Sequence, residues 1–203
     1  MKRVLDLIFA GVGLVIVSPL LLVAMATIRC TSKGPVFFQQ KRVGKNFKTF
    51  NILKLRTMIV NTSKDGLTIT RSGDHRITPV GRFLRKAKID ELPQLINVLL
   101  GHMSLVGPRP EVPEYVELFR EDFETILSVR PGITDPSSIE FRNESELLQK
   151  ATDPQVAYIE TILPKKLAIS KQYIEHASLP YDLLLIIKTF TAIIYTPKRK
   201  CAV

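Results

Sequence analysis

The adjacent carboxylates Asp90 and Glu91 are the residues of this sequence best suited to chemistry. They follow a strongly basic stretch, because residues 33–88 contain fourteen Lys or Arg and only two acidic residues. A carboxylate can attack phosphorus as a nucleophile, and it can hold a hard cation such as Mg²⁺ together with phosphate oxygens. A competing interpretation is structural, with Asp90 as a helix N-cap and Glu91 in the first turn, which is a common arrangement.

The residues that follow the pair predict the helix that positions it. An apolar helical pattern runs from about Leu92 to Leu100, and Gly101 ends it. Pro93 fits only the first turn of such a helix, so Asp90 is expected near the N-cap. The unpaired N–H groups of a helix start would then bind an anion beside the carboxylates.

Two arginines lie in rigid turns that could hold them toward a phosphate. Arg109 stands between two prolines in Gly107-Pro108-Arg109-Pro110, and Arg130 precedes Pro131-Gly132. A planar guanidinium group is the side chain best suited to bidentate phosphate binding. We therefore expect both arginines to face an anionic substrate.

Other cations fall on predicted regular structure. Lys54 and Arg56 alternate with apolar residues in a predicted strand, so they would share one face. They could present two cations to an anion, or they could protect an edge strand by charge, and the pattern favours neither. Thr78-Pro79 is a cap signal for a short helix through Lys86, which carries Arg85.

The N-terminal segment is apolar and long enough to cross a bilayer. Residues 7–28 carry no charge, but basic residues flank both ends, which favours cytoplasm on both sides. Ser18-Pro19 lies at the midpoint, where Pro19 removes a backbone hydrogen bond and Ser18 can satisfy the freed carbonyl. A re-entrant helix-break-helix and an ordinary kinked span both fit this pattern.

The rest of the chain predicts a mostly helical α+β fold. Residues 35–40 and 47–53 read as a β-hairpin, and most later segments read as helix. The last helix, Tyr181 to Tyr195, is too short to span a bilayer, so it is either core or interfacial, and we favour interface contact. We expect a re-entrant membrane hairpin at residues 1–32. Residues 33–203 should form a cytosolic, membrane-associated catalytic domain with amphipathic interfacial helices.

Composition narrows the function classes. The net charge of +10 is concentrated in residues 33–88, which suits phosphates, nucleotides, nucleic acid or acidic lipids. No Ser-His or Cys-His pairing and no zinc-ligand spacing is present in the sequence. Phosphate chemistry at a membrane surface fits this inventory best, with no nucleic-acid partner expected. A membrane-tethered protein that binds nucleic acid or anionic lipid, and a cell-envelope scaffold, remain as alternatives.

Six motifs give the chain a specific resemblance. It resembles the bacterial sugar transferases, and among them the small monotopic phosphoglycosyl transferases. The resemblance covers nearly the whole chain and implies the minimal catalytic form. The motifs are Lys2-Arg3-x-x-Asp6, Ser18-Pro19, Leu53-Lys54-Leu55-Arg56-Thr57-Met58, Asp90-Glu91-Leu92-Pro93-Gln94, Gly107-Pro108-Arg109-Pro110 and Arg130-Pro131-Gly132-Ile133-Thr134.

The resemblance implies a reaction and its partners. A sugar 1-phosphate would pass from a UDP-sugar to a polyprenyl phosphate, normally undecaprenyl phosphate, with release of UMP. The reaction would use Mg²⁺ at the cytoplasmic face of the bacterial inner membrane, in contact with membrane lipid. It would initiate glycoconjugate assembly, such as capsule, O-antigen, exopolysaccharide or glycoprotein glycan. The resemblance is compatible with a monomer and with a homodimer.

The resemblance also implies roles for individual residues. Asp90 would be the nucleophile that carries the phosphosugar, and Glu91 would assist it and the Mg²⁺ site, so both are metal candidates. Ser18 and Pro19 would form the break of a re-entrant hairpin, which favours that topology over a span. Five cations would lie near the substrate phosphates: Lys54, Arg56, Arg85, Arg109 and Arg130.

Two departures from the family pattern are visible. His102 stands where many relatives have an acid, and residues 135–143 replace a Gly-Leu-Ala-Gln type of sequence. The second change is expected near the sugar site. It therefore puts the identity of the sugar in question and leaves the reaction type unchanged.

Overall fold

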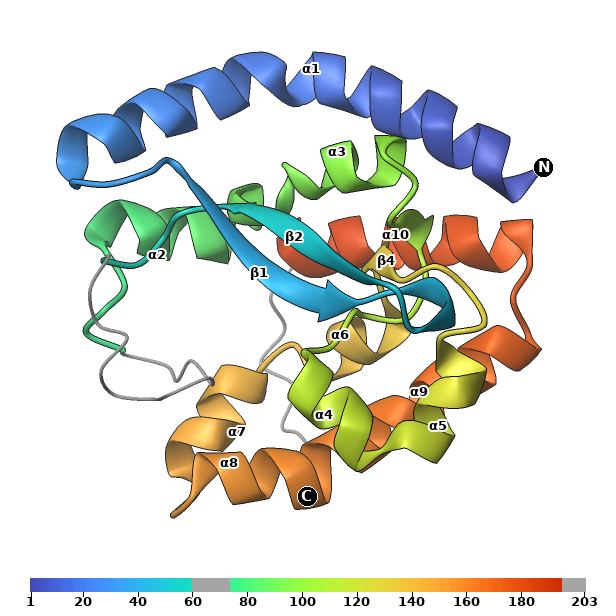
Figure 1. Ribbon diagram of the computed structural model, residues 1–203. Helices are drawn as coiled ribbons and strands as arrows, with labels where there is room; N and C mark the ends of the chain where they lie inside the picture. The colour runs from blue at the N-terminus through green and yellow to red at the C-terminus, as the bar shows by residue number, and fades with distance from the viewer. Residues whose placement is uncertain (60–73, 195–203) are drawn as a thin grey trace.

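The computed structural model describes residues 1–59 and 74–194. Its fold is α+β and mostly helical, as predicted, with two small sheets (Figure 1). The helices are α1 (Lys2–Thr31), α2 (Pro79–Lys86), α3 (Gln94–Leu99), α4 (Pro113–Leu118), α5 (Arg120–Ile126), α6 (Pro136–Glu140), α7 (Glu144–Lys150), α8 (Pro154–Ala157), α9 (Leu163–Glu175) and α10 (Leu179–Ile194). The strands are β1 (Phe37–Val43), β2 (Thr49–Leu55), β3 (Ser104–Val106) and β4 (Gly132–Thr134).

The N-terminal segment is one helix, α1, with Pro19 inside it. The predicted break into two helices was therefore wrong. Ser18 supplies the physical reason, because its Oγ donates a hydrogen bond to the carbonyl of Val15 at 2.7 Å. This is the carbonyl that the amide of a non-proline residue at position 19 would occupy, so the helix continues through the proline. Figure 1 shows α1 arched over the rest of the molecule.

Both ends of α1 are fastened to the body of the protein. At its C-terminal end, Nη2 of Arg56 donates to the carbonyl of Ser32 at 2.9 Å. At its N-terminal end, three charged residues of the first two turns bind segments that lie far along the chain. These contacts are the Lys2–Asp182 ion pair, Arg3 Nη2 to the Val98 carbonyl at 2.7 Å, and Ser104 Oγ to Asp6 Oδ2 at 2.8 Å.

The outward side of α1 is strongly apolar. Within the described residues, α1 is the one helix long and apolar enough to cross a membrane, with a mean hydropathy of 2.7 over its most apolar window. Only 17% of that window is buried inside the protein, so most of its apolar surface has no protein partner. Large apolar side chains exposed along it include Val4, Ile8, Phe9, Val12, Val15, Ile16, Leu22 and Val23.

The predicted hairpin is confirmed, with both strands beginning two residues later than expected. β1 and β2 pair antiparallel, and Phe37 lies opposite Leu55 while Val43 lies opposite Thr49. Figure 1 shows the hairpin crossing the molecule beneath α1 and α3. The end of β2 delivers Lys54 to the segment that contains the acidic pair.

A second, parallel pair of short strands was not predicted. Ser104 pairs with Gly132 and Val106 with Thr134, which joins the two arginine turns backbone to backbone. The amide of Gly132 donates to the carbonyl of Pro108 at 2.9 Å. A Cβ atom at Gly132 would lie 2.1 Å from the Gly107 nitrogen, so this approach requires glycine.

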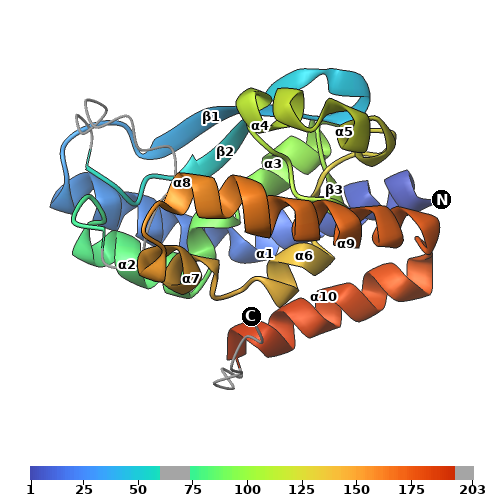
Figure 2. The same cartoon turned by 90° about the horizontal axis from the view of Figure 1, so that it is seen from below.

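Helices α4, α5, α7 and α9 form the apolar core with the most buried residues, which includes Phe123, Leu148, Leu163 and Leu167. One π-helical turn, Tyr158–Ile162, separates α8 from α9, and Pro164 lies in the first turn of α9. Figure 2 shows α9 crossing the molecule and α10 returning beside it. The last helix buries Leu185 but exposes the large apolar residues Leu179, Leu183, Leu184, Ile187 and Phe190.

Candidate active site

The acidic pair lies in a tight turn ahead of α3. Asp90 and Glu91 belong to a 3₁₀ turn, Ile89–Glu91, that starts from Lys88 in a left-handed conformation with φ of 58°. The first regular turn of α3 begins only at Gln94, with Pro93 as its N-cap. Asp90 therefore lies near the N-cap of this helical segment, Lys88, as predicted, but it is itself the cap of neither the turn nor α3. The 3₁₀ turn, rather than a helix end, positions both carboxylates.

Glu91 binds two cations that lie far from it in the sequence. Its Oε1 accepts a hydrogen bond from Nζ of Lys54 at 2.7 Å and another from Nη2 of Arg109 at 2.8 Å. Burial opposes ionisation of Glu91, but the charges of Arg109, Lys54 and Lys88 outweigh it and hold its pKa well below its usual range. Glu91 is therefore a permanent anion that fixes two cations beside Asp90.

Asp90 has the opposite environment. Its side chain is buried, and Oδ1 has no hydrogen-bond partner among the residues that the structure describes. Burial and the charge of Glu91 raise its pKa above the ordinary value, while Lys54, Lys88 and Arg85 partly offset them. Neighbouring carboxyls whose pKa values move apart are expected to take different tasks. Asp90 is therefore the more basic carboxylate, and one of its buried oxygens is unpaired within the described residues.

The other predicted cations lie in different places. Nε of Arg85 donates to Oγ1 of Thr57 at 2.8 Å, and its charge favours ionised Asp90, so it lies at the edge of the site. Arg56 instead binds carbonyls at the end of α1. Nε of Arg130 donates to the carbonyl of Gly101 at 2.9 Å and so holds a loop. The structure thus brings Lys54, Arg85 and Arg109 toward the pair and gives Arg56 and Arg130 partners elsewhere.

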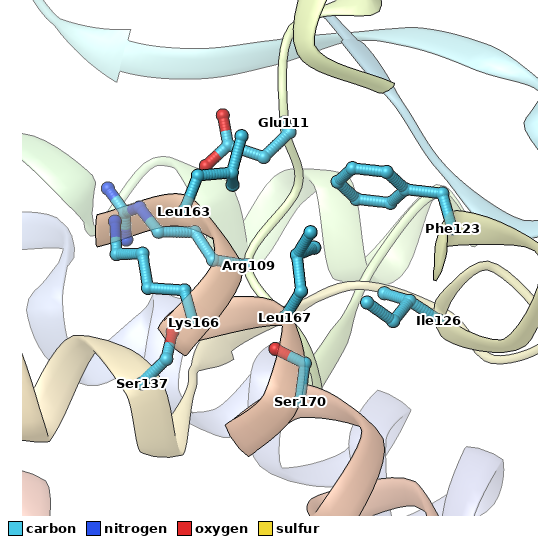
Figure 3. A pocket seen from close by; sticks show the side chains of 9 residues that line it. All are labelled: Arg109, Glu111, Phe123, Ile126, Ser137, Leu163, Lys166, Leu167 and Ser170. Carbon is cyan, nitrogen blue, oxygen red and sulfur yellow. The ribbon is translucent and has the colours of Figure 1, made fainter. Parts of the chain in front are cut away.

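A small cavity lies behind Arg109. Figure 3 shows the charged ends of Arg109 and Lys166 on one side of it and the apolar side chains Phe123 and Ile126 on the other. Glu111 also lines this cavity. The remaining lining residues are Ser137, Leu163, Leu167 and Ser170.

Sequence reasoning missed the group that supports Arg109. Glu111 accepts from the hydroxyl of Tyr158 at 2.7 Å and from Arg42 at 3.3 Å, and Arg42 also binds the carbonyl of Pro110 at 3.1 Å. These contacts fix the chain directly after Arg109. The signal for Glu111 was its position next to Pro110, whereas nothing in the spacing marked Arg42 or Tyr158.

An apolar pocket opens between α1, the start of β1 and the start of α3. Its walls come from the middle of α1, the start of β1 and the segment that follows Glu91. The lining residues are Ser18, Leu21, Leu22, Met25, Phe37, Pro93 and Ile96. Pro93 follows Asp90 by three residues in the chain, and the almost wholly apolar lining suits a hydrocarbon chain.

The carboxylates suit a metal that is shared with substrate. In the described part of the chain, no three His, Cys, Asp or Glu side chains gather into a metal cluster. Glu91 is already shared by two cations, whereas Oδ1 of Asp90 has no partner in that same part. Mg²⁺ is commonly held by one or two carboxylates together with substrate phosphates. The pair fits that arrangement and does not fit a closed protein site.

Relatives of known type match this sequence along most of its length. The chain is 36% identical over 196 residues to the UDP-N-acetylgalactosamine-undecaprenyl-phosphate N-acetylgalactosaminephosphotransferase of Aeromonas hydrophila, which covers 95% of this chain and 43% of that protein. It is 36% identical over 199 residues to the UDP-glucose:undecaprenyl-phosphate glucose-1-phosphate transferase of Caulobacter vibrioides, covering 96% and 70%. It is 34% identical over 207 residues to the exopolysaccharide production protein ExoY of Sinorhizobium fredii, covering 95% and 84%.

The match extends along the chain and not only around the motifs. The chain spans less than half the length of the Aeromonas relative. The family model described as bacterial sugar transferase matches residues 1–196, which include α1, both arginine turns and the acidic pair. On this match, together with the relatives, the chain belongs to the bacterial sugar transferase family.

Proposed function

We propose that this protein transfers a sugar 1-phosphate from a UDP-sugar to a polyprenyl phosphate such as undecaprenyl phosphate and releases UMP. Several relatives carry names for transfer between these classes of donor and acceptor. The observation that carries the proposal is the free Oδ1 of buried Asp90 within the described residues, beside a Glu91 that is neutralised by two cations. A free nucleophile next to fixed positive charge suits attack on a diphosphate.

In the first half-reaction, Oδ1 of Asp90 attacks the phosphorus that bears the sugar. A bond forms between that oxygen and phosphorus, and the bond from phosphorus to the bridging oxygen of the diphosphate breaks. UMP leaves with the bridging oxygen and its electron pair. Lys54 and Arg109, held 2.7 and 2.8 Å from Glu91, would stabilise the charge that develops on the phosphates.

In the second half-reaction, a phosphate oxygen of the acceptor attacks the same phosphorus. The bond to Asp90 breaks, which restores the carboxylate and gives a polyprenyl diphosphate sugar. The apolar pocket between α1 and Pro93 supports this step, because it would hold the first part of a hydrocarbon chain next to Asp90. The acceptor phosphate and the phosphosugar would then meet at the carboxylate.

Magnesium is part of this proposal. When bound, it would neutralise charge on the diphosphate and orient it. Asp90 and Glu91 are the residues that would hold it. Since Glu91 is already paired with Lys54 and Arg109, most ligands would come from the substrate and water.

The membrane arrangement follows from α1. Arg56 fastens one end of this apolar helix to the body, and Lys2 fastens the other through Asp182. A helix held at both ends by one polar body cannot easily place those ends on opposite sides of a bilayer. We infer a re-entrant or interfacial helix, with α10 also in the interface, and residues 33–203 at the cytoplasmic face of the bacterial inner membrane.

The test is UMP release by the purified protein with a panel of UDP-sugars, polyprenyl phosphate and Mg²⁺. Asp90→Asn should abolish release, and intact-mass analysis without acceptor should detect a phosphosugar adduct on the wild type alone. Full activity of Asp90→Asn would show that the nucleophile is another residue. Failure of the wild type with every UDP-sugar would reject the reaction.

A membrane-tethered protein that binds external polyanions is less well supported. Lys54, Arg56 and Arg85, from the basic stretch, bind groups inside the protein. Their cations are therefore not displayed on an open surface.

A further inference from the structure

A stripe of polar side chains runs along the segment that carries the acidic pair. The 3₁₀ turn passes into α3 through Leu92, which has helical backbone angles. Asp90, Glu91, Gln94 and Asn97 recur three or four residues apart, so they share one face of this segment. This is unusual, because the buried face of a short helix is normally apolar.

The stripe faces β2. The amide of Leu53 donates to Oδ1 of Asn97 at 2.9 Å, and the next residue, Lys54, binds Glu91 at 2.7 Å. The strand therefore passes Asn97 first and Glu91 next. Gln94 lies between these two contacts on the same face, which places it against β2 and beside the carboxylates.

Gln94 differs from Asn97 in how its amide is used. Asn97 satisfies both ends, since its Nδ2 also donates to the carbonyl of Asn51 at 2.8 Å. Gln94 is 1% exposed, yet its Nε2 has no partner among the described residues. A buried amide without a partner lowers stability, so its presence calls for a ligand. Oδ1 of Asp90, one turn earlier, also lacks a partner there.

We propose that the side-chain amide of Gln94 donates a hydrogen bond to a non-bridging oxygen of the phosphoryl group that Asp90 attacks. This rests on the proposed function and adds a catalytic residue to it. The terminal amide can rotate, and a phosphoryl oxygen selects the orientation that presents N–H. No proton is transferred, and the hydrogen bond strengthens as charge shifts onto the phosphoryl oxygens.

A neutral donor at this position has a specific advantage. A further cation against Asp90, in addition to Lys54, Lys88 and Arg85, would lower the proton affinity of its carboxylate and with it the nucleophilicity. The amide of Gln94 stabilises charge on phosphorus-bound oxygen without that effect. The cations Lys54 and Arg109 remain tied to Glu91, one residue along the chain.

The test compares Gln94→Met, which keeps the length and removes the donor, with Asn97→Met, which removes a fully bonded amide. For Gln94→Met we expect a melting temperature at or above the wild-type value. Its kcat for UMP release should fall about 100-fold, with KM for the UDP-sugar changed by less than about threefold. Asn97→Met should instead lower the melting temperature.

Two results would overturn the assignment. One is a Gln94→Met protein with wild-type kcat, and the other is one whose melting temperature falls as far as that of Asn97→Met. Asp90→Asn, assayed in parallel, separates this failure from failure of the proposed function. If the wild type releases UMP and Asp90→Asn does not, the reaction stands whatever Gln94→Met does.

Discussion

Nη2 of Arg109 donates to Oε1 of Glu91 at 2.8 Å, which joins two motifs that lie 18 residues apart. Lys54 binds the same oxygen at 2.7 Å, from a strand that ends well before either motif. One carboxylate oxygen thus connects the hairpin, the acidic turn and the parallel strand pair. The geometry of the site depends on this shared contact.

Glu91→Gln should therefore damage both stability and activity. It leaves Lys54 and Arg109 close together without their anion, and their side chains are only 19% and 29% exposed. We expect a loss of about 2 kcal/mol in the free energy of unfolding, below the value for a fully buried pair. Activity should fall by about 100-fold or more, because the cations are no longer fixed. Thermal unfolding and UMP release measure the two effects.

Glu117→Gln is the matched control for Glu91→Gln. Glu117 pairs with Arg120 at 3.0 Å, but their side chains are 72% and 56% exposed. Exposed pairs of this kind contribute little, so stability should change by less than about 0.5 kcal/mol and activity should be unchanged. If the two substitutions have equal effects, the ion pairs of Glu91 contribute no more to stability and activity than the exposed ion pair of Glu117.

Gly132→Ala tests the close approach of the two arginine turns. The new Cβ would meet the Gly107 nitrogen at 2.1 Å, so the strands β3 and β4 must separate. Because Arg109 follows Gly107 by two residues, we expect loss of stability together with loss of UMP release. Gly11→Ala is the control, since a Cβ there meets nothing within 4 Å and alanine favours helix. A Gly132→Ala protein that melts like Gly11→Ala would contradict the expected clash between the two turns.

Sequence patterns predicted the local features of this protein well. The hairpin, the cap of α2 by Thr78 and the satisfaction of a carbonyl by Ser18 each depend on neighbouring residues, and all three are confirmed. The hydroxyl of Ser18 also explains the main error in the fold. It replaces the hydrogen bond that Pro19 cannot donate, so α1 stays continuous and lacks the break that the proline had suggested.

Partners that are distant along the chain were less predictable. Lys54 and Arg56 had equal claims to an anion site, because alternation says which residues share a face and not what that face meets. In the structure Lys54 reaches Glu91, while Arg56 reaches Ser32. The pairing of β3 with β4 was missed because three-residue strands carry almost no periodic signal.

Asp135→Asn should change stability in a pH-dependent way. Asp135 caps α6 through one carboxylate oxygen, and the other is buried without a partner among the described residues. Burial raises its pKa above the ordinary 3.8, although Ser137, Arg109 and Ser138 offset part of this. The folded protein therefore binds this proton more tightly than the unfolded chain, and the resulting stability is lost as pH rises through the folded pKa.

Asparagine keeps an acceptor for the cap and carries no charge, so its contribution is independent of pH. The stability of Asp135→Asn relative to wild type should therefore increase from about pH 4 to about pH 8. Melting temperatures measured across that range test this expectation. A difference that shrinks as pH rises would show that the pKa of Asp135 is lowered in the folded state.

The apolar pocket between α1 and Pro93 predicts a defect confined to the acceptor. Leu22 lines the pocket and is 62% exposed, so Leu22→Trp should fit α1 while filling the space for a hydrocarbon chain. We expect the KM for polyprenyl phosphate to rise about tenfold, which corresponds to about 1.4 kcal/mol of lost binding. Formation of the phosphosugar adduct from UDP-sugar alone should be unchanged, because neither the acidic pair nor its cations line the pocket that Leu22 lines.

Val23→Trp provides the comparison on the same helix. Val23 is 65% exposed and does not line the pocket, so its replacement places the same indole ring on α1 outside that space. Its KM for the acceptor should match the wild-type value. If both variants raise this KM equally, the effect comes from how α1 sits in lipid, and the pocket does not hold the acceptor chain. A rise for Leu22→Trp alone assigns the hydrocarbon to the pocket between α1 and Pro93.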